Sequence, residues 1–265
     1  MKLPLSSAAV DHLEVVRETG STNDDLVARA AVLSDFSVVA TGSQTAGRGR
    51  LGRVWVAPPG ASLAVSVLLR PVLPGGEALE PRHFGWLPLI AGIAMTRAVQ
   101  SLVPAERVGL KWPNDVQVDG LKISGLLAEL VPAGDAVVMG AGLNLSLSRD
   151  QLPTPVSTSL SLSGVDLVGD ELADAALSAY LIALRELYTD FVRLGGDPVG
   201  SGVADELADL CTTIGQQVKV QLPGAPDLFG SAIGIDASGR LQVRSSLDGH
   251  VTAVAAGDVT HLRYE

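Results

Sequence analysis

The hairpin signal in VGLKWPNDVQVDGLKISGLLAEL, residues 108–130, is the strongest local constraint on the fold of this chain. Asp119-Gly120 is a favoured two-residue turn. Two valines alternate with polar residues before it, and Leu121 and Ile123 continue the alternation of apolar and polar residues after it. The segment is therefore predicted to form a β-hairpin.

Hydrophobic periodicity predicts further strands and helices up to about residue 210. The predicted strands are 13–19, 37–41, 61–69 and 136–147. The predicted helices are 21–33, 84–103, 171–194 and 201–210, and the predicted loop between two of them is 148–163. Ser21 or Thr22 can cap the first helix.

The pattern changes after residue 214, where short β-like runs are separated by turns. About 50 residues of this kind are too few to enclose a substantial core alone. We place a boundary near 210–214, which divides the chain into a larger unit, 1–212, and a small β unit, 213–265.

Charge and composition exclude several classes of function. The formal net charge of −10 and the isoelectric point near 4.8 argue against bulk nucleic-acid binding, which depends on a positive surface. Cys211 is the only cysteine and the four histidines have no metal-ligand spacing, so no disulfide and no metal site are predicted. The N-terminal residues resemble neither a signal peptide nor an anchor, and the longest apolar stretch, around 84–95, is too short to span a bilayer. We therefore expect a cytoplasmic protein.

Four stretches stand out as candidate site segments: GSTND at 20–24, QTAGRGRLGRVW at 44–55, KWPNDV at 111–116 and GAGLNLS at 140–146. Ordinary explanations exist, namely a helix cap, a solvated basic turn and glycines that allow close packing. However, the three arginines of the second stretch repel one another unless an anion offsets their charge. The chain has no GxxxxGK[ST] phosphate loop, and GRGRLG does not open a helix after a strand as a dinucleotide site requires.

Lys122 lies just after the hairpin turn. On a strand it points away from Leu121 and Ile123, so it faces the other surface of the sheet if those two face the core. A lysine in such a place is commonly only solvated. Gly125, three residues further on, would leave room for a ligand beside the strand.

In this order, GSTN, QTAGRGRLGRVW, KWPNDV, KISG at 122–125 and GAGLNLS resemble the motifs of the biotin protein ligases. The resemblance covers the whole chain. It implies an α+β fold in which a mixed, mainly antiparallel sheet is backed by helices, similar to the class II aminoacyl-tRNA synthetase core, with a small SH3-like β-barrel after it. Some relatives carry an N-terminal DNA-binding repressor domain. GSTN at 20–23 leaves no room for one here, so the chain resembles the monofunctional form, and neither DNA nor a membrane is an expected partner.

The resemblance implies a reaction in two steps. The carboxylate of biotin attacks the α-phosphorus of ATP, which binds with Mg²⁺, to give biotinyl-5′-AMP and pyrophosphate. The ε-amine of a lysine on the biotin carboxyl carrier protein domain of an acyl-CoA carboxylase then attacks this anhydride and releases AMP. The first step joins two anions that must be screened, and the second needs the anhydride kept from water.

The resemblance also assigns site residues by position. The implied biotin-binding residues are Ser21, Thr22, Asn23, Gln44, Arg48, Gly49, Arg50, Lys122 and Gly125. The implied nucleotide-binding residues are Arg48, Arg50, Arg53, Lys111, Asn114, Lys122 and Asn144. The implied catalytic residues are Lys122, Arg48, Arg50 and Asp115.

Three further expectations concern this site. Asp115 is expected to receive or orient the incoming lysine. Trp55 and Trp112 are expected either to form apolar walls for biotin or to be ordinary core residues. The arginine–glycine loop, 44–55, is expected to be unordered until biotin arrives, and then to close over the ligand.

Two other functions remain as alternatives. A lipoate–protein ligase would use similar lysine chemistry, but a dithiolane needs an apolar tunnel, whereas Ser21, Thr22, Asn23 and Gln44 suit a ureido ring. A non-catalytic biotin-binding protein would not need Lys122 and three loop arginines.

Overall fold

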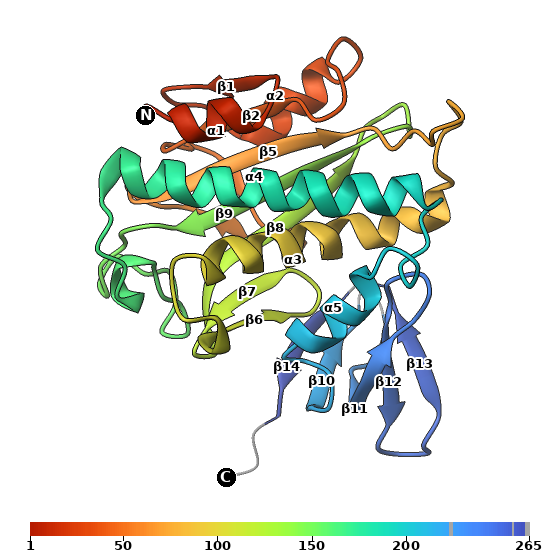
Figure 1. Ribbon diagram of the computed structural model, residues 1–265. Coiled ribbons are helices and arrows are strands. Elements are labelled where there is room, and N and C mark those ends of the chain that lie inside the picture. The colour runs from red at the N-terminus through yellow and green to blue at the C-terminus, as the bar shows by residue number, and fades with distance from the viewer. Residues whose placement is uncertain (223–224, 256, 263–265) are drawn as a thin grey trace.

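The computed structural model describes residues 1–222, 225–255 and 257–262, and its centre is a seven-stranded sheet (Figure 1). The strand order is β1 (Leu13–Val15), β2 (Val38–Thr41), β5 (Ser62–Leu69), β9 (Val137–Asn144), β8 (Leu121–Leu130), β7 (Asp115–Val118) and β6 (Val108–Lys111). Only β1 and β2 pair in parallel, and the other neighbours are antiparallel. The predicted mixed, mainly antiparallel sheet is confirmed.

The predicted hairpin joins β7 to β8. Asp119 and Gly120 both have positive φ, 51° and 75°, as a two-residue turn of the favoured hairpin type requires. A bulge leaves Ile123 without a cross-strand partner, and Ile123 is fully buried. Leu121, which begins β8 beside the turn, is 37% exposed, so the expectation that it shares the buried face with Ile123 is wrong.

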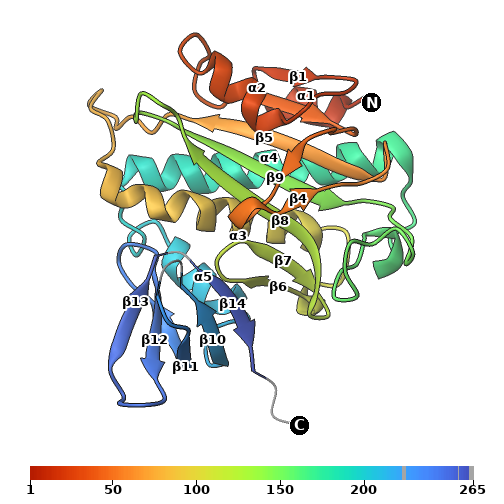
Figure 2. The same ribbon diagram turned by 180° about the vertical axis from the view of Figure 1, so that it is seen from behind.

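Two long helices cover one face of the sheet, and a shorter helix covers part of the other. The helices are α1 (Pro4–Ala9), α2 (Thr22–Arg29), α3 (Leu87–Gln100), α4 (Gly169–Arg193) and α5 (Val203–Leu210). Figure 2 shows α3 and α4 behind the strands. The side chains of α2 pack instead with alternate residues of β2, β5 and β9, so both faces of the central strands are buried. None of the helices among the described residues is long and apolar enough to cross a membrane.

Two predicted elements are shorter in the structure. The strand expected over 13–19 ends at Val15, because β1 pairs only with Val38–Ala40 and makes only one isolated bridge further on. The helix expected over 21–33 ends at Arg29. Val32 is 85% exposed, so little apolar burial would support a further helical turn there.

A second sheet follows α5. It is antiparallel, in the order β13 (Val251–Val254), β12 (Leu241–Ser245), β11 (Leu228–Ile235), β10 (Gln217–Gln221) and β14 (Asp258–His261), and it is consistent with the predicted small SH3-like domain. Its buried residues belong to the same hydrophobic cluster as the larger sheet. Two indole hydrogen bonds also connect the two parts. Trp86 Nε1 donates to the Ala237 carbonyl at 2.9 Å, and Trp112 Nε1 donates to the Gly239 carbonyl at 3.4 Å. The small unit thus depends on its neighbour for part of its core.

Candidate active site

A cavity of about 850 Å³ opens beside the sheet, on the face away from α3 and α4. Every residue predicted for the site lines it. These residues are Ser21, Thr22, Asn23, Gln44, Arg48, Gly49, Arg50, Arg53, Lys111, Asn114, Asp115, Lys122, Gly125 and Asn144. Segments that are far apart in the sequence therefore meet in one place.

The start of α2 forms one wall. Ser21 is the N-cap residue but makes no capping hydrogen bond through its side chain, so the expected side-chain cap is wrong. The polar groups of Thr22 instead face Gln44: its backbone N–H donates to Gln44 Oε1 at 2.9 Å, and its hydroxyl oxygen lies 3.2 Å from the same atom. The side chain of Asn23 is buried and contacts β5 and β8. The helix start is thus tied to the first residue of the arginine-rich segment rather than capped by itself.

The arginine-rich segment forms a small hairpin. Strand β3 (Gly47–Arg48) pairs with β4 (Val54–Trp55), and a single turn of 3-10 helix, Arg50–Gly52, connects them. Figure 2 shows β4 in front of β8, on the cavity side of the sheet. The hairpin therefore lies across the cavity, where a lid would lie. Whether it is ordered before biotin binds stays a prediction.

The loop arginines have partners that the sequence did not indicate. Arg48 forms ion pairs with Asp24 and with Glu129, the latter at 3.0 Å. Arg50 donates to Asn114 Oδ1 at 3.0 Å and to the Gly257 carbonyl at 3.3 Å. Carboxylates of the protein itself thus offset part of the positive charge of this segment.

Lys122 and Asp115 form the central ion pair of the cavity. The Lys122 Nζ lies 2.6 Å from Asp115 Oδ1, and both side chains are partly exposed, at 32% and 23%. A Cβ at Gly125 would lie 2.9 Å from Nζ, so this glycine makes room for the lysine head itself. The expectation that Lys122 faces away from Ile123 is confirmed, because Lys122 lines the cavity and Ile123 lies in the core.

The two tryptophans have different environments. Trp112 is 2% exposed and belongs to the core, so the core interpretation holds for it. Trp55 lines the cavity, and its ring lies against Gly142 of β9. A Cβ at Gly142 would approach the Trp55 Cε2 atom to 2.5 Å. A glycine is therefore required if the indole is to lie flat against the sheet.

Gly142→Ala should push Trp55 out of the cavity wall and lower the affinity for a ligand that packs on the indole. We expect the dissociation constant for biotin to rise by about tenfold or more, as for the loss of one well-packed apolar contact. Isothermal titration of biotin measures this directly. Gly75→Ala is the matched control, because a Cβ at Gly75 meets open space. Equal affinities in the two variants would contradict the placement of Trp55.

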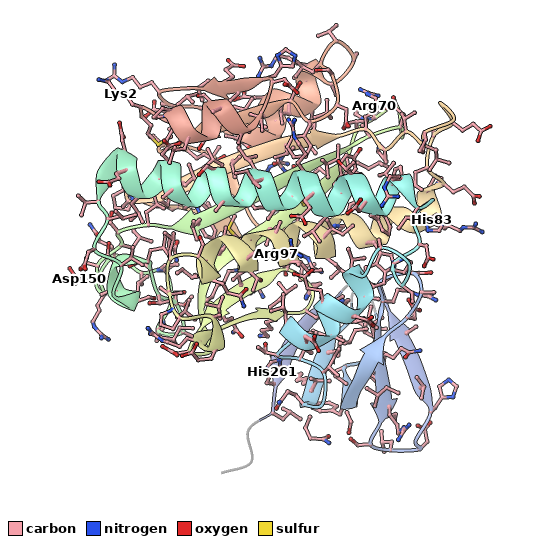
Figure 3. The ribbon with its side chains drawn as sticks, viewed as in Figure 1. Lys2, Arg70, His83, Arg97, Asp150 and His261 are labelled. Carbon is pink, nitrogen blue, oxygen red and sulfur yellow. The ribbon has the colours of Figure 1, made fainter. Side chains whose placement is uncertain are left out.

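The far end of the cavity is closed by the second sheet. The residues that close this end are Thr212 and Gln216, just before the second sheet, and Gly257, Val259, Thr260 and His261, in or beside its last strand. His261, which lies where the two sheets approach each other (Figure 3), has its Nε2 3.1 Å from the Thr213 hydroxyl. The Thr213 oxygen also accepts the backbone N–H of Trp112 at 3.0 Å. No local pattern in the sequence indicates this wall, because it depends on how the two units pack.

Three further polar residues of the cavity lining are Lys111, Asn114 and Asn144. The Asn114 amide donates to the Leu126 carbonyl at 2.8 Å, and the buried Asn144 amide donates to the Thr158 carbonyl at 2.8 Å. Both amides therefore also hold neighbouring backbone segments in place. Within the described ranges, no three His, Cys, Asp or Glu side chains are grouped as metal ligands.

Comparisons with known proteins agree with this arrangement. The sequence model of the biotin/lipoate A/B protein ligase family matches residues 14–144, and that of the biotin protein ligase C-terminal domain matches 213–262. The chain is 40% identical to the biotin–[acetyl-CoA-carboxylase] ligase of Mycobacterium tuberculosis over 95% of this chain and 89% of that protein. The chain belongs to the biotin protein ligase family.

Other members of the family extend the comparison. The bifunctional ligase/repressor BirA of Escherichia coli is 33% identical over 91% of this chain and 71% of its own length. The biotin protein ligase of Aquifex aeolicus, solved in complex with biotin and ATP, superimposes with a TM-score of 0.69 at 25% identity, covering 96% of this chain and 100% of that one. The α+β fold predicted from the sequence is thus that of solved biotin protein ligases.

Proposed function

We propose that this protein is a biotin–[acetyl-CoA-carboxylase] ligase. It activates biotin with ATP to form biotinyl-5′-AMP and transfers the biotinyl group to one lysine of a biotin carboxyl carrier domain. The observation that carries the proposal is the meeting of the Lys122–Asp115 pair, the arginine hairpin and the polar start of α2 in one cavity. Relatives named as biotin ligases support it.

The cations of the cavity suit the activation step. A carboxylate that approaches the α-phosphate meets a second anion, and fixed positive groups offset the charge that develops. Lys122 supplies an ammonium held by Asp115, and Arg50 supplies a guanidinium held by Asn114. Asp115 thus orients Lys122, and Asn114 orients Arg50 when the hairpin is closed, so little reorganisation is needed during the reaction.

The α2 side of the cavity suits the ureido ring of biotin. That ring has two N–H donors and one carbonyl acceptor, and each needs a partner when it is buried. Ser21, Thr22, Asn23 and Gln44 offer hydroxyl and amide groups there, and the backbone at Gly125 is proposed to offer more. Trp55 gives an apolar wall for the rest of the molecule. A dithiolane has no N–H or carbonyl group to offer this polar wall, whereas a ureido ring has three such groups, so biotin is the proposed substrate rather than lipoate.

The nucleotide is proposed to occupy the other end of the cavity. Arg53, Lys111 and Asn144 line the cavity and are proposed to bind the nucleotide, and Mg²⁺ enters with ATP as part of the substrate. The division of the chain at 212/213 is also a proposal. It assigns the biotin side to the larger unit and lets the smaller one close the nucleotide end.

Transfer to a carrier domain is the direct test of the function as a whole. The protein, ATP, Mg²⁺ and biotin should label a biotin carboxyl carrier domain, as detected with streptavidin. The same domain with its acceptor lysine changed to arginine should stay unlabelled. We propose that this reaction takes place in the cytoplasm. Labelling of neither carrier would contradict the proposed transfer.

Replacing Arg50 with methionine should make the enzyme leak its intermediate. Without the bonds to Asn114 and Gly257, the arginine hairpin closes the cavity less well and water reaches the anhydride. We expect about a tenfold faster release or hydrolysis of biotinyl-5′-AMP, as for loss of a charge-assisted contact. Chromatography of quenched reactions without carrier measures it.

Arg193→Met is the control for that experiment. Arg193 forms an exposed ion pair with Asp190 on α4 and lies outside the cavity lining. The Arg193→Met variant should release or hydrolyse biotinyl-5′-AMP at the wild-type rate. If Arg50→Met leaked no faster than this control, the hairpin would not act as a lid.

A further inference from the structure

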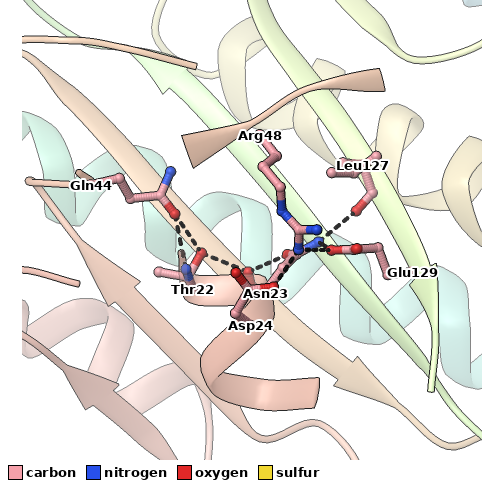
Figure 4. Close-up of polar contacts among 8 residues, drawn as sticks. Thr22, Asn23, Asp24, Gln44, Arg48, Leu127 and Glu129 are labelled. Atoms are coloured by element: carbon pink, nitrogen blue, oxygen red, sulfur yellow. Dashed lines mark hydrogen bonds and ion pairs between the residues drawn. The ribbon is translucent and has the colours of Figure 1, made fainter. Parts of the chain in front are cut away.

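A chain of hydrogen bonds starts in the arginine hairpin segment and returns to it. It starts at Gln44, passes through Thr22 to the buried hydroxyl of Ser66 on β5, and continues to Asn23. From Asn23 it reaches Glu129 on β8, which also binds Arg48 (Figure 4). The segment 44–48 is thereby connected at both ends to the start of α2.

Ser66 and Glu129 together fix the orientation of the Asn23 amide. The Ser66 hydroxyl lies 2.6 Å from Asn23 Oδ1, and Glu129 Oε2 lies 2.5 Å from Asn23 Nδ2. An ionised carboxylate is an acceptor only, so it must face the NH₂ end of the amide. The carbonyl end then faces the hydroxyl, and Asn23 Nδ2 directs its remaining N–H to the Leu127 carbonyl oxygen, 3.4 Å from the nitrogen.

Arg48 is held by carboxylates of the protein itself. Its Nη2 contacts Glu129 Oε2 at 3.0 Å and also pairs with Asp24. The side chain of Asp24 is 61% exposed, whereas that of Glu129 is 26% exposed. Solvent weakens exposed ion pairs, so the Glu129 contact contributes more to holding the hairpin.

We propose that Glu129 is a positioning residue that couples closure of the arginine hairpin to the shape of the biotin site. One carboxylate oxygen binds both Asn23, in the wall proposed to bind the ureido ring, and Arg48, in the hairpin that covers it. This inference rests on the proposed function. It assigns the Arg48 side chain to holding the hairpin closed against Glu129, in addition to the contacts of Arg50 with Asn114 and Gly257.

Glu129→Gln tests the coupling, because the amide keeps the size of the side chain and removes its charge. We expect the dissociation constant for biotin to rise by about tenfold, since two hydrogen bonds to one charged acceptor are weakened. The kcat for pyrophosphate release at saturating biotin and ATP should stay nearly unchanged. A role in folding alone would lower the melting temperature or the active fraction without this split.

Glu14→Gln is the matched control. Glu14 of β1 pairs with Arg29, at the end of α2, at 2.7 Å but lies outside the cavity lining, so its variant should bind biotin as the wild type does. Arg48→Met and the double variant with Glu129→Gln complete a double-mutant cycle. If the two residues act as a unit, the double variant loses less affinity than the product of the single losses.

The outcomes separate the inference from the function on which it rests. Biotin-dependent pyrophosphate release by the wild type, with a selective and non-additive loss of biotin affinity in the variants, supports both. If the wild type is active but Glu129→Gln keeps its biotin affinity, the coupling alone is overturned. The same holds if the affinity loss of the double variant equals the product of the losses in Glu129→Gln and Arg48→Met. A wild type that releases no pyrophosphate with biotin would overturn the proposed function, and this inference with it.

Discussion

Lys122→Ala should reduce the rate of biotin-dependent pyrophosphate release by about 10²–10³, the usual effect of removing one charged group that stabilises a transition state. The variant should still fold, because the side chain is partly exposed and the backbone of Lys122 keeps its place in the ladder opposite Gln117. Stopped-flow or coupled assays of pyrophosphate in the absence of carrier measure the effect on the first step alone.

Lys219→Ala is a close control for that variant. Lys219 pairs with Asp227 at 2.8 Å in the second sheet, and its side chain is 32% exposed, as is that of Lys122. Loss of this pair should leave pyrophosphate release unchanged. If Lys122→Ala behaved like Lys219→Ala, Lys122 would have no part in activating biotin.

Asp115→Asn should slow transfer of biotin from preformed biotinyl-5′-AMP by about 10²-fold or more, the usual contribution of a group that handles a proton in the reaction. The amide oxygen can still accept from Lys122, so activation should be affected much less than transfer. The incoming amine is protonated at neutral pH, and the carboxylate of Asp115 gives it a place to be oriented and to lose its proton. Single-turnover transfer to a carrier domain measures the rate.

Hydroxylamine provides a test that is specific to this role. It is largely unprotonated at neutral pH, so its attack on the bound adenylate needs no carboxylate to receive a proton. Asp115→Asn should therefore react with hydroxylamine nearly as the wild type does. Transfer to carrier lysine at the wild-type rate would show that Asp115 has no role in the second step.

The parts of the site that were predictable lie within short motifs. GSTN, the arginine segment, KWPND and KISG are short runs of polar, charged and glycine residues whose order resembles the biotin protein ligases, so they were visible in the sequence. The hairpin at Asp119-Gly120 was equally visible, because a two-residue turn leaves few alternatives. The cavity brings all of these segments together.

The parts that were missed depend on contacts between distant strands. Ser66 and Glu129 each stand between apolar neighbours in their strands, and nothing local distinguishes them from solvated positions. Trp55 and Trp112 could not be distinguished either, since only packing against Gly142 or the core decides the environment of each indole. The wall formed by the second sheet likewise follows from the docking of one unit on the other.

Pyrophosphate release tests the central claim most directly. The purified protein is incubated with ATP and Mg²⁺, and with biotin, lipoate or neither. We expect release that depends on biotin and is absent or much slower with lipoate, because a ureido ring, unlike a dithiolane, can hydrogen-bond to the polar wall that includes Thr22, Asn23 and Gln44. Faster release with lipoate would identify a lipoate–protein ligase, and binding of biotin without any release would identify a non-catalytic biotin-binding protein; either result would contradict the proposed function.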